Sequence, residues 1–258
     1  MCRLVGYAGA PVAPAVTVFG GSHSLLQQSY APRELLTGTV NADGYAVTWY
    51  PDGKPVRVAG AEPIWQNPDL ERLLASVEAP VVAGGVRNAT PGIPPDPSGI
   101  APLCQDRWTF ALNGFVESFR ARGMRAFHAG IPDALYGRMQ GTSDTEALFL
   151  LALARLQRGA DPEEAAAEVV QQASEVADEL GVEAQLNLLL TAPNRLVVTR
   201  ASNRDESNSL YVSEQARLAP EGCLVASEPL EEDGTWWRVP HDSVVAVGPD
   251  GRARVQSL

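Results

Sequence analysis

The chain begins Met1-Cys2-Arg3-Leu4-Val5-Gly6-Tyr7-Ala8, in which a cysteine is followed at once by a short apolar run that predicts a β-strand. If the initiator methionine is removed, a thiol and a free α-amino group lie on one residue. Thiol chemistry requires the thiolate, and an α-amine with a pKa of about 7.7 to 8.0 is a suitable acceptor for the thiol proton. This stretch therefore makes Cys2, at the start of an N-terminal strand, a candidate nucleophile.

Apolar runs bounded by turn residues dominate both ends of the chain and predict strands. They cover residues 4–8, 45–50, 81–87, 108–112, 186–190, 195–199, 210–212, 223–226 and 244–247. Two long helices are predicted between them. One is capped by Ser143 with Glu146 three residues later, and the other has Asp161 as N-cap, Pro162 at its first position and Gly181 beyond its end. A shorter helix is predicted over residues 69–77.

We find no repeat or break in composition that divides the chain, so the sequence predicts one domain over residues 1–258. Its sheets are expected to be layered with helices, which is an α+β architecture. The proline-rich segment Thr90 to Pro102 predicts an ordered, irregular loop that is a candidate wall of a binding site. The polar segment Ala201 to Asn208 is interpreted as a hairpin loop.

Charge and hydropathy restrict the partners. The 258 residues include 20 Lys and Arg against 31 Asp and Glu, a net charge of −11, which disfavours nucleic acids and anionic membranes. No run approaches the roughly 20 apolar residues of a membrane helix, and the N-terminus lacks a secretion signal. We therefore expect a cytoplasmic protein that acts on a small molecule.

The cysteines and histidines argue against a metal centre. Three cysteines without a CxxC pair predict neither disulfides nor zinc, and His23, His128 and His241 lack metal-ligand spacing. Cys223 lies in an apolar run and is interpreted as a buried hydrophobic residue, whereas Cys104 carries no signal. No metal or cofactor is expected.

Two motifs at strand ends could bind or activate a substrate. Arg87 follows a buried strand and precedes the irregular loop, where its planar fork could hold a carboxylate; the alternative is a surface ion pair. Asn113-Gly114 is first of all a tight-turn signal between apolar runs. The same pair could also supply a side-chain amide and an unhindered backbone N–H to an oxyanion.

Two further motifs have a structural alternative of their own. Asp144 lies in the first turn of the helix that Ser143 caps, where a carboxylate is favoured by the helix dipole and could also hold an ammonium group. Asn41-Ala42-Asp43-Gly44 is a turn that enters a strand, for which a structural role is the default.

The order and spacing of these motifs resemble the class II glutamine amidotransferases, whose N-terminal cysteine cleaves a γ-glutamyl amide. The matching residues are Met1-Cys2-Arg3, Asn41-Ala42-Asp43-Gly44, Arg87 with Thr90, Asn113-Gly114 and Ser143-Asp144-Thr145. A branch of γ-glutamyl hydrolases in ergothioneine biosynthesis is the most similar. The segments that carry that resemblance are Gln28 to Arg33, Asn41 to Tyr45, Pro63-Ile64-Trp65, Arg87 to Thr90, Leu186-Asn187-Leu188-Leu189 and Ala226-Ser227-Glu228-Pro229.

The resemblance implies a four-layer αββα N-terminal nucleophile hydrolase fold of two antiparallel sheets between helical layers. It also implies a nucleophilic Cys2 freed by removal of Met1, and an oxyanion hole made of Asn113 and Gly114. The substrate's α-carboxylate is then expected at Arg87, with Thr90 in the same binding segment, and its α-amine at Asp144. One departure is Leu112, which stands where the family usually has histidine.

Three functions are compatible with these residues, and all leave the formation of homo-oligomers open. The leading hypothesis is hydrolysis of a γ-glutamyl amide through a thioester on Cys2. The second is a glutaminase-like subunit that passes ammonia to a separate partner protein. The third is a non-catalytic module that binds γ-glutamyl metabolites and does not need a free Cys2 amine.

Overall fold

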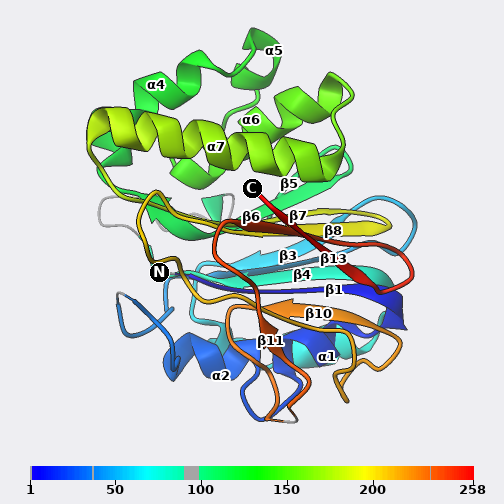
Figure 1. Ribbon diagram of the computed structural model, residues 1–258. Coiled ribbons are helices and arrows are strands. Elements are labelled where there is room, and N and C mark those ends of the chain that lie inside the picture. The colour runs from blue at the N-terminus through cyan, green and yellow to red at the C-terminus, as the bar shows by residue number, and fades with distance from the viewer. Residues whose placement is uncertain (1, 37, 90–98, 233) are drawn as a thin grey trace.

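The computed structural model describes residues 2–36, 38–89, 99–232 and 234–258 and has four layers (Figure 1). The first sheet has the strand order β11-β9-β10-β1-β4-β2-β3. Its strands are β1 Arg3–Val12, β2 Tyr45–Trp49, β3 Val56–Gly60, β4 Ala79–Val86, β9 Tyr211–Ser213, β10 Gly222–Ala226 and β11 Trp237–Arg238. The second sheet has the order β13-β12-β8-β7-β6-β5. Its strands are β5 Leu103–Gln105, β6 Trp108–Val116, β7 Ala184–Ala192, β8 Arg195–Arg200, β12 Ser243–Val247 and β13 Ala253–Ser257.

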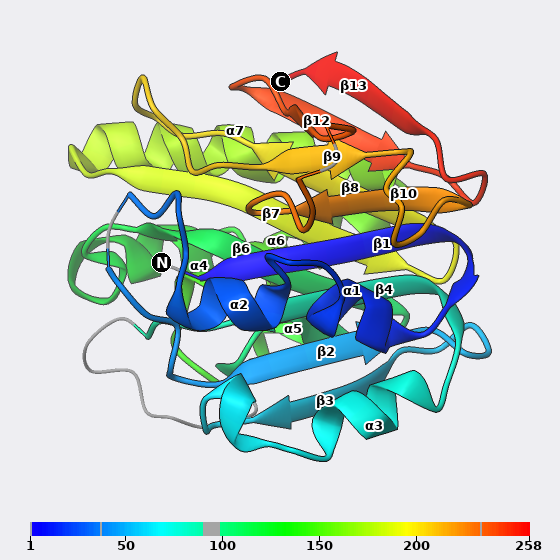
Figure 2. The ribbon, with the colours of Figure 1, turned by 90° about the horizontal axis from the view of Figure 1, so that it is seen from below.

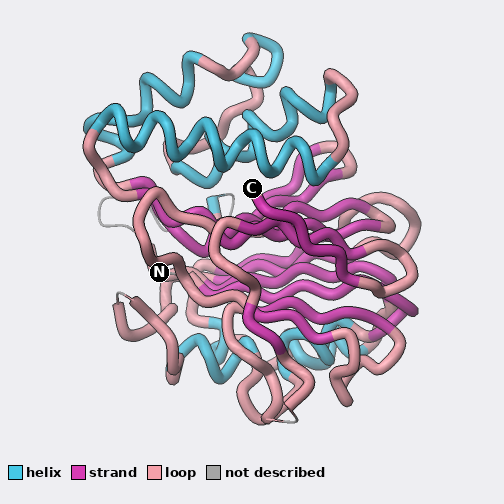
Figure 3. Tube along the Cα trace, viewed as in Figure 1, coloured by secondary structure: helices cyan, strands magenta, loops and turns pink. Residues whose placement is uncertain are grey.

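All strand pairs in these sheets are antiparallel, and helices cover both outer faces. The first sheet is covered by α1 Pro14–Phe19, α2 Leu25–Tyr30 and α3 Leu70–Ala75, which lie in front of it in Figure 2, the view from below. The second is covered by α4 Met124–Ala129, α5 Asp133–Tyr136, α6 Asp144–Gln157 and α7 Pro162–Leu180. The coloured trace shows both strand layers between the helices (Figure 3). The expected α+β fold with four αββα layers is confirmed.

The two long helices form where the sequence predicts them. The Ser143 hydroxyl accepts a hydrogen bond from the Glu146 N–H, which satisfies one free donor of the first turn of α6. From Ala147 to Ala154 every residue of α6 is buried, because α7 and the second sheet pack on different sides of it. Each fully buried leucine there contributes about 2 kcal/mol by leaving water. Asp161 precedes α7 as expected, but its side chain makes no capping hydrogen bond.

An apolar cluster lies between the two sheets, and the alternation of side chains along the strands decides which residues enter it. Leu4 and Ala8 of β1 belong to this cluster, whereas Val5 and Tyr7 pack toward the outer helices. A Cβ on Gly6 would lie 2.6 Å from Cδ1 of Leu196 in the opposite sheet, which places even-numbered positions of β1 on the inner face. Cys2 shares this parity and therefore faces the second sheet.

Two predicted loops need comment. The hairpin expected over Ala201 to Asn208 is wrong, because β8 lies in the second sheet and β9 in the first, so this segment crosses between sheets. The buried Arg200 side chain holds the crossing by donating to the carbonyl oxygens of Ser207, Asn208 and Val239. Of the irregular loop, residues 90–98 are outside the described residues, and its last part includes the buried Ile100.

Candidate active site

The register of the first sheet brings Cys2 and Arg87 to the same end of neighbouring strands. Arg3 of β1 is opposite Val86 of β4, and Val86 is opposite Tyr45 of β2. Cys2 precedes Arg3 and Arg87 follows Val86, so both lie just beyond the paired residues. Residues far apart in the sequence therefore meet at one end of the central strands.

A cleft at this end of the strands is lined by most of the predicted site residues. Its lining includes Cys2, Arg87, Gly114 and Asp144, together with Leu112. Asn113 is completely buried and lies behind the lining, whereas Thr90 is outside the described residues. Leu112 packs in the core between the second sheet and its helices, and it gives the cleft an apolar wall.

Asn113-Gly114 is not a turn, as its dipeptide signal suggested, but part of β6. Asn113 is opposite Asn187 and Gly114 is opposite Leu186 across the ladder with β7. A Cβ on Gly114 would lie 1.8 Å from the carbonyl oxygen of Gln185, so no side chain fits there. Glycine is required by this close approach of two strands, and the absence of a side chain also leaves the cleft wall unhindered at the Gly114 backbone.

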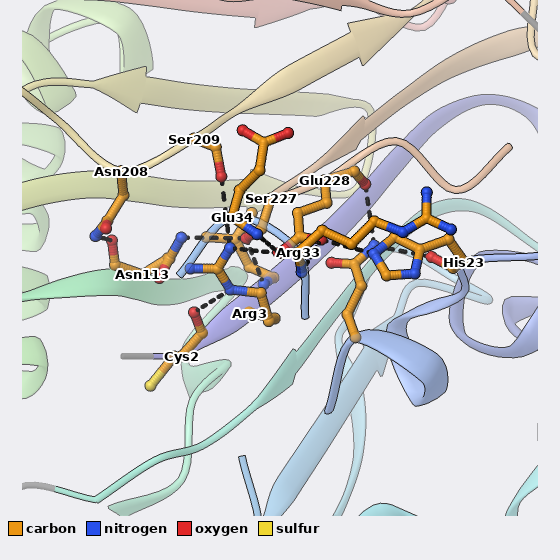
Figure 4. Close-up of polar contacts among 12 residues, drawn as sticks. Cys2, Arg3, His23, Arg33, Glu34, Asn113, Asn208, Ser209, Ser227 and Glu228 are labelled. Atoms are coloured by element: carbon orange, nitrogen blue, oxygen red, sulfur yellow. Dashed lines mark hydrogen bonds and ion pairs between the residues drawn. The ribbon is translucent and has the colours of Figure 1, made fainter. Parts of the chain in front are cut away.

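The Asn113 side chain lies on the inner face of β6, which it shares with Ala111 of the inter-sheet cluster. Its Nδ2 donates to the Ser227 hydroxyl at 3.1 Å, and its backbone carbonyl accepts from Asn208 Nδ2 at 3.0 Å (Figure 4). Since a carboxamide nitrogen has two hydrogens, one remains for another acceptor.

Arg87 is 8% exposed, which contradicts its alternative interpretation as a surface ion-pair residue. Its Nη1 is buried without a hydrogen-bond partner, and no carboxylate among the described residues forms an ion pair with it. Its backbone is held firmly: the Arg87 N–H donates to Gly44 and its carbonyl accepts from the Asp43 N–H. A buried guanidinium without a partner is costly unless an anion joins it.

The segment before β2 therefore has the structural role expected of it. The Asp43 carboxylate also accepts the Ala89 N–H at 2.8 Å, so this turn braces both sides of Arg87. Gly44 has a φ of +111°, a conformation that side chains disfavour, and a Cβ there would lie 2.4 Å from Ile100.

Asp144 begins α6 and connects that helix to β6. Its carboxylate accepts the Val116 N–H at 2.9 Å and the Thr145 N–H at 2.8 Å. Burial raises the pKa of this carboxyl despite both hydrogen bonds, and no cation among the described residues pairs with it. The cleft thus has an unpaired cation at Arg87 and an unpaired anion at Asp144.

Sequence reasoning missed a buried polar cluster beside Cys2, which we call the Glu228 cluster: Arg3, His23, Glu228 and the backbone of Arg33 and Glu34 (Figure 4). The Glu228 carboxylate accepts from Arg3 Nη1 at 3.1 Å and His23 Nε2 at 2.6 Å. It also accepts from the backbone N–H groups of Arg33 and Glu34. Arg3 Nε in turn donates to the Cys2 carbonyl at 2.9 Å.

The available signal for this cluster was the segment Ala226 to Pro229, to which the sequence analysis assigned no role. Within the described ranges, no group of three or more His, Cys, Asp or Glu side chains could hold a metal ion. No helix in the same ranges has the length and apolar character needed to cross a membrane.

Comparison with known proteins decides the family. A model of the glutamine amidotransferases class II matches residues 21–256, which is most of the chain. The chain belongs to the class II glutamine amidotransferases. Solved structures agree on the fold of this family. A glutamine aminotransferase class-II domain protein from Silicibacter pomeroyi has a TM-score of 0.71 and 22% identity, with 99% of each chain covered.

The glutamine phosphoribosylpyrophosphate amidotransferase of B. subtilis has a TM-score of 0.64 and 18% identity. The match covers 99% of this class II amidotransferase and 49% of the B. subtilis chain.

Among curated relatives, the γ-glutamyl-hercynylcysteine sulfoxide hydrolase of Mycolicibacterium smegmatis is 31% identical over 248 residues, 96% of each chain. The protein of the same name from Mycobacterium tuberculosis (strain CDC 1551 / Oshkosh) is 29% identical over 252 residues, 97% of this chain and 94% of the relative. The expectation that this class II amidotransferase is an enzyme is thereby confirmed. Its role is that of a γ-glutamyl hydrolase or a class II glutamine amidotransferase.

Proposed function

We propose that this enzyme hydrolyses a γ-glutamyl amide, with γ-glutamyl-hercynylcysteine sulfoxide as the leading substrate. The observation that carries the proposal is the pair of unmatched charges in the cleft. Arg87 and Asp144 each lack an oppositely charged partner among the described residues, and both line the cleft that contains Cys2. A γ-glutamyl group carries the complementary α-carboxylate and α-ammonium groups.

Binding at both charges orients the glutamyl chain. The α-carboxylate pairs with the Arg87 guanidinium, whose fork matches two oxygens, and the α-ammonium pairs with the Asp144 carboxylate. The free end of the chain, with its δ-carbonyl, then extends toward Cys2. Holding the reactants in this way converts a bimolecular encounter into an effectively unimolecular step.

The proposed reaction uses the chain's own groups throughout. With Met1 removed, the Cys2 α-amine accepts the thiol proton and the thiolate attacks the δ-carbonyl. Asn113 Nδ2 and the Gly114 N–H stabilise the oxyanion of the tetrahedral intermediate. The C–N bond breaks as the protonated α-amine gives its proton to the departing amine. Water then hydrolyses the γ-glutamyl thioester and releases glutamate. Met1 lies outside the described residues, so its removal remains part of the proposal.

The identity of the leaving amine rests on the two curated relatives, whose printed name specifies γ-glutamyl-hercynylcysteine sulfoxide. Family membership alone supports the second candidate, a glutaminase that supplies ammonia to a separate partner protein. The two differ in the preferred substrate, since an ammonia donor should favour free glutamine.

A glutamate-release assay with both substrates tests the proposal. The wild type is expected to have the higher kcat/KM for the sulfoxide conjugate, and Cys2→Ala is expected to be inactive. Higher kcat/KM for glutamine would favour the ammonia donor instead. Retained hydrolysis in Cys2→Ala, or in a protein whose intact mass shows Met1 in place, contradicts the mechanism. Binding of the conjugate without turnover by a wild type that lacks Met1 would identify a non-catalytic module.

A further inference from the structure

Ser227 joins the two strands that carry the proposed nucleophile and the proposed oxyanion donor. It directly follows β10 and is completely buried. Its hydroxyl oxygen accepts the Leu4 N–H at 2.9 Å and Asn113 Nδ2 at 3.1 Å. Its backbone N–H donates to the Leu4 carbonyl at 2.9 Å. Leu4 belongs to the first sheet and Asn113 to the second, so this one side chain spans the inter-sheet layer (Figure 4).

These contacts use the full acceptor capacity of the hydroxyl. A serine oxygen has two acceptor positions, and the Leu4 and Asn113 donors occupy both. Asn113 has few other restraints on its carboxamide: its Oδ1 is buried without a hydrogen-bond partner in the described part of the chain. The hydrogen bond to Ser227 therefore fixes the orientation of Nδ2 relative to β1, two residues from Cys2.

We propose that Ser227 is a positioning residue that orients the Asn113 carboxamide for oxyanion stabilisation. This inference rests on the proposed function, because orientation of Nδ2 matters only if that nitrogen donates to the reacting carbonyl. Electrostatic stabilisation of this kind depends on donors that are already in place, and a displacement of about 1 Å can cost 10²-fold in rate. Ser227 itself does not line the cleft, so its role is exerted through Asn113.

A double-mutant cycle separates this role from simple support of β1. Asn113→Ala is expected to lower kcat by about 10²- to 10³-fold, as loss of one oxyanion donor does. Ser227→Ala is expected to lower kcat by about 10-fold and to change KM by less than about 2-fold, since the charge clamp is intact. If Ser227 acts through Asn113, Ser227→Ala has almost no further effect on kcat in the Asn113→Ala background.

Ser213→Ala is the matched control. Ser213 is a completely buried serine at the end of β9, and its hydroxyl contacts Thr235 Oγ1 at 2.7 Å and the Gln215 N–H at 3.4 Å. The Ser213→Ala substitution removes the same hydroxyl group from the neighbouring strand, at a serine that does not contact Asn113. Its kcat is expected to stay within about 2-fold of wild type, with thermal unfolding recorded for every variant.

The outcomes are distinct. Non-additive effects on kcat support the positioning role. Equal losses in both backgrounds assign the effect to the Leu4 contact and overturn the role, as does a kcat for Ser227→Ala equal to that of the wild type. A wild type that hydrolyses neither the sulfoxide conjugate nor glutamine overturns the proposed function first and the role of Ser227 with it.

Discussion

Gly114 lies where β6 passes so close to β7 that a single methyl group cannot be accommodated. In Gly114→Ala the new Cβ would meet the Gln185 carbonyl oxygen at 1.8 Å, so the ladder must open. Overpacking of this kind costs about 1–3 kcal/mol, which for a chain of this size lowers Tm by roughly 2–12 °C. Calorimetry checks the stability, and the same protein is expected to lose activity because the oxyanion strand moves.

Gly137→Ala is the control for Gly114→Ala. Gly137 has an ordinary φ of −63°, and its new Cβ would come no closer than 3.5 Å to the Asp133 carbonyl. Its Tm should change by less than about 2 °C. Equal Tm values for both variants would contradict the steric explanation for Gly114.

Titration of the Asp144 carboxyl is expected to determine the pH dependence of kcat/KM on the acid side. Burial raises the pKa of the Asp144 carboxyl, so its charged form, which is the form that binds ammonium, is lost at a higher pH than for an ordinary aspartate with a pKa of about 3.9. The acid limb of kcat/KM should therefore lie above pH 4, because kcat/KM reports the free enzyme. Asp144→Asn is expected to remove this limb and to lower kcat/KM at least about 30-fold at neutral pH.

The matched variant for Asp144→Asn is Asp133→Asn, which removes an exposed acid from the first turn of α5. Steady-state kinetics from pH 4 to 8 should show the wild-type profile for this control. An unchanged acid limb in Asp144→Asn would assign the titration to a different group and remove Asp144 from the clamp.

Among single residues, the sequence could predict site candidates where a charged side chain lies at an unusual position. Arg87 after a buried strand and Asp144 in a capped first turn could be predicted to lie in the cleft because each is next to a recognisable element boundary. Ser227 and Asn208 could not be predicted in this way, because an ordinary serine or asparagine acquires its role from its contacts. Both contact Asn113, which is 114 residues from Ser227 and 95 residues from Asn208 in the sequence. No local pattern encodes such contacts.

The Glu228 cluster holds several elements together, and its charge pair is buried. Glu228 accepts from Arg3 of β1, from His23 before α2 and from the backbone after α2, and the Arg3 and Glu228 side chains are 0% and 1% exposed. Breaking a buried pair by removing one charge typically costs about 3–5 kcal/mol. Glu228→Gln is therefore expected to lower the free energy of unfolding by about 3 kcal/mol at pH 7, as measured by urea titration.

The same variant has a defined pH dependence. Burial alone would raise the pKa of Glu228, but the hydrogen bonds from His23, Arg33 and Glu34 and the charge of Arg3 outweigh it, so the pKa is lowered. The stability from this group is fully present above the unfolded pKa of about 4.3 and is lost as the pH falls through the lower folded value. The difference in the free energy of unfolding between the wild type and Glu228→Gln should therefore become smaller from pH 5 toward pH 3.

Glu232→Gln tests the same substitution at an exposed site. Its ion pair with Arg33 joins side chains that are 57% (Arg33) and 72% (Glu232) exposed, so its loss should cost less than about 1 kcal/mol. If both substitutions destabilised the protein equally, or if the Glu228→Gln gap stayed constant with pH, the buried charge pair would not be the cause.

Elements with a strong local pattern could be predicted, including the six-residue helix α3 that was expected over residues 69–77, whereas elements without such a pattern could not. The long helices α6 and α7 and the apolar strands β1, β4, β7 and β12 have strong local patterns. Helices α1 and α2 have only six residues each, and β13 has an exposed surface pattern, so their structure depends on what they pack against. The placement of β8 and β9 in different sheets was also beyond local patterns, because a polar connection looks the same whether it turns back or crosses between sheets.

For the whole molecule, the layered arrangement predicts a gradient of local stability. Every residue of β7 is buried and the strand pairs on both sides with β6 and β8, whereas β13 pairs only with β12 and exposes most of its residues. Amides of β7 are expected to exchange hydrogen only through global unfolding, and those of β13 through local opening. Hydrogen-exchange mass spectrometry at increasing urea should show strong denaturant dependence for β7 and little for β13. Equal protection of the two strands would contradict this gradient.

The central position of β1 has a consequence for how the protein is made. Val5 pairs with Gly84 on one side and with Ala226 on the other, so the first strand out of the ribosome gains its second neighbour only after most of the chain has been synthesised. Until then the nascent N-terminus has no completed sheet around it, and this is the stage at which the proposed removal of Met1 would take place. On the proposed mechanism, translation order separates two events: Met1 is removed first, and the Cys2 thiol enters its cleft afterwards.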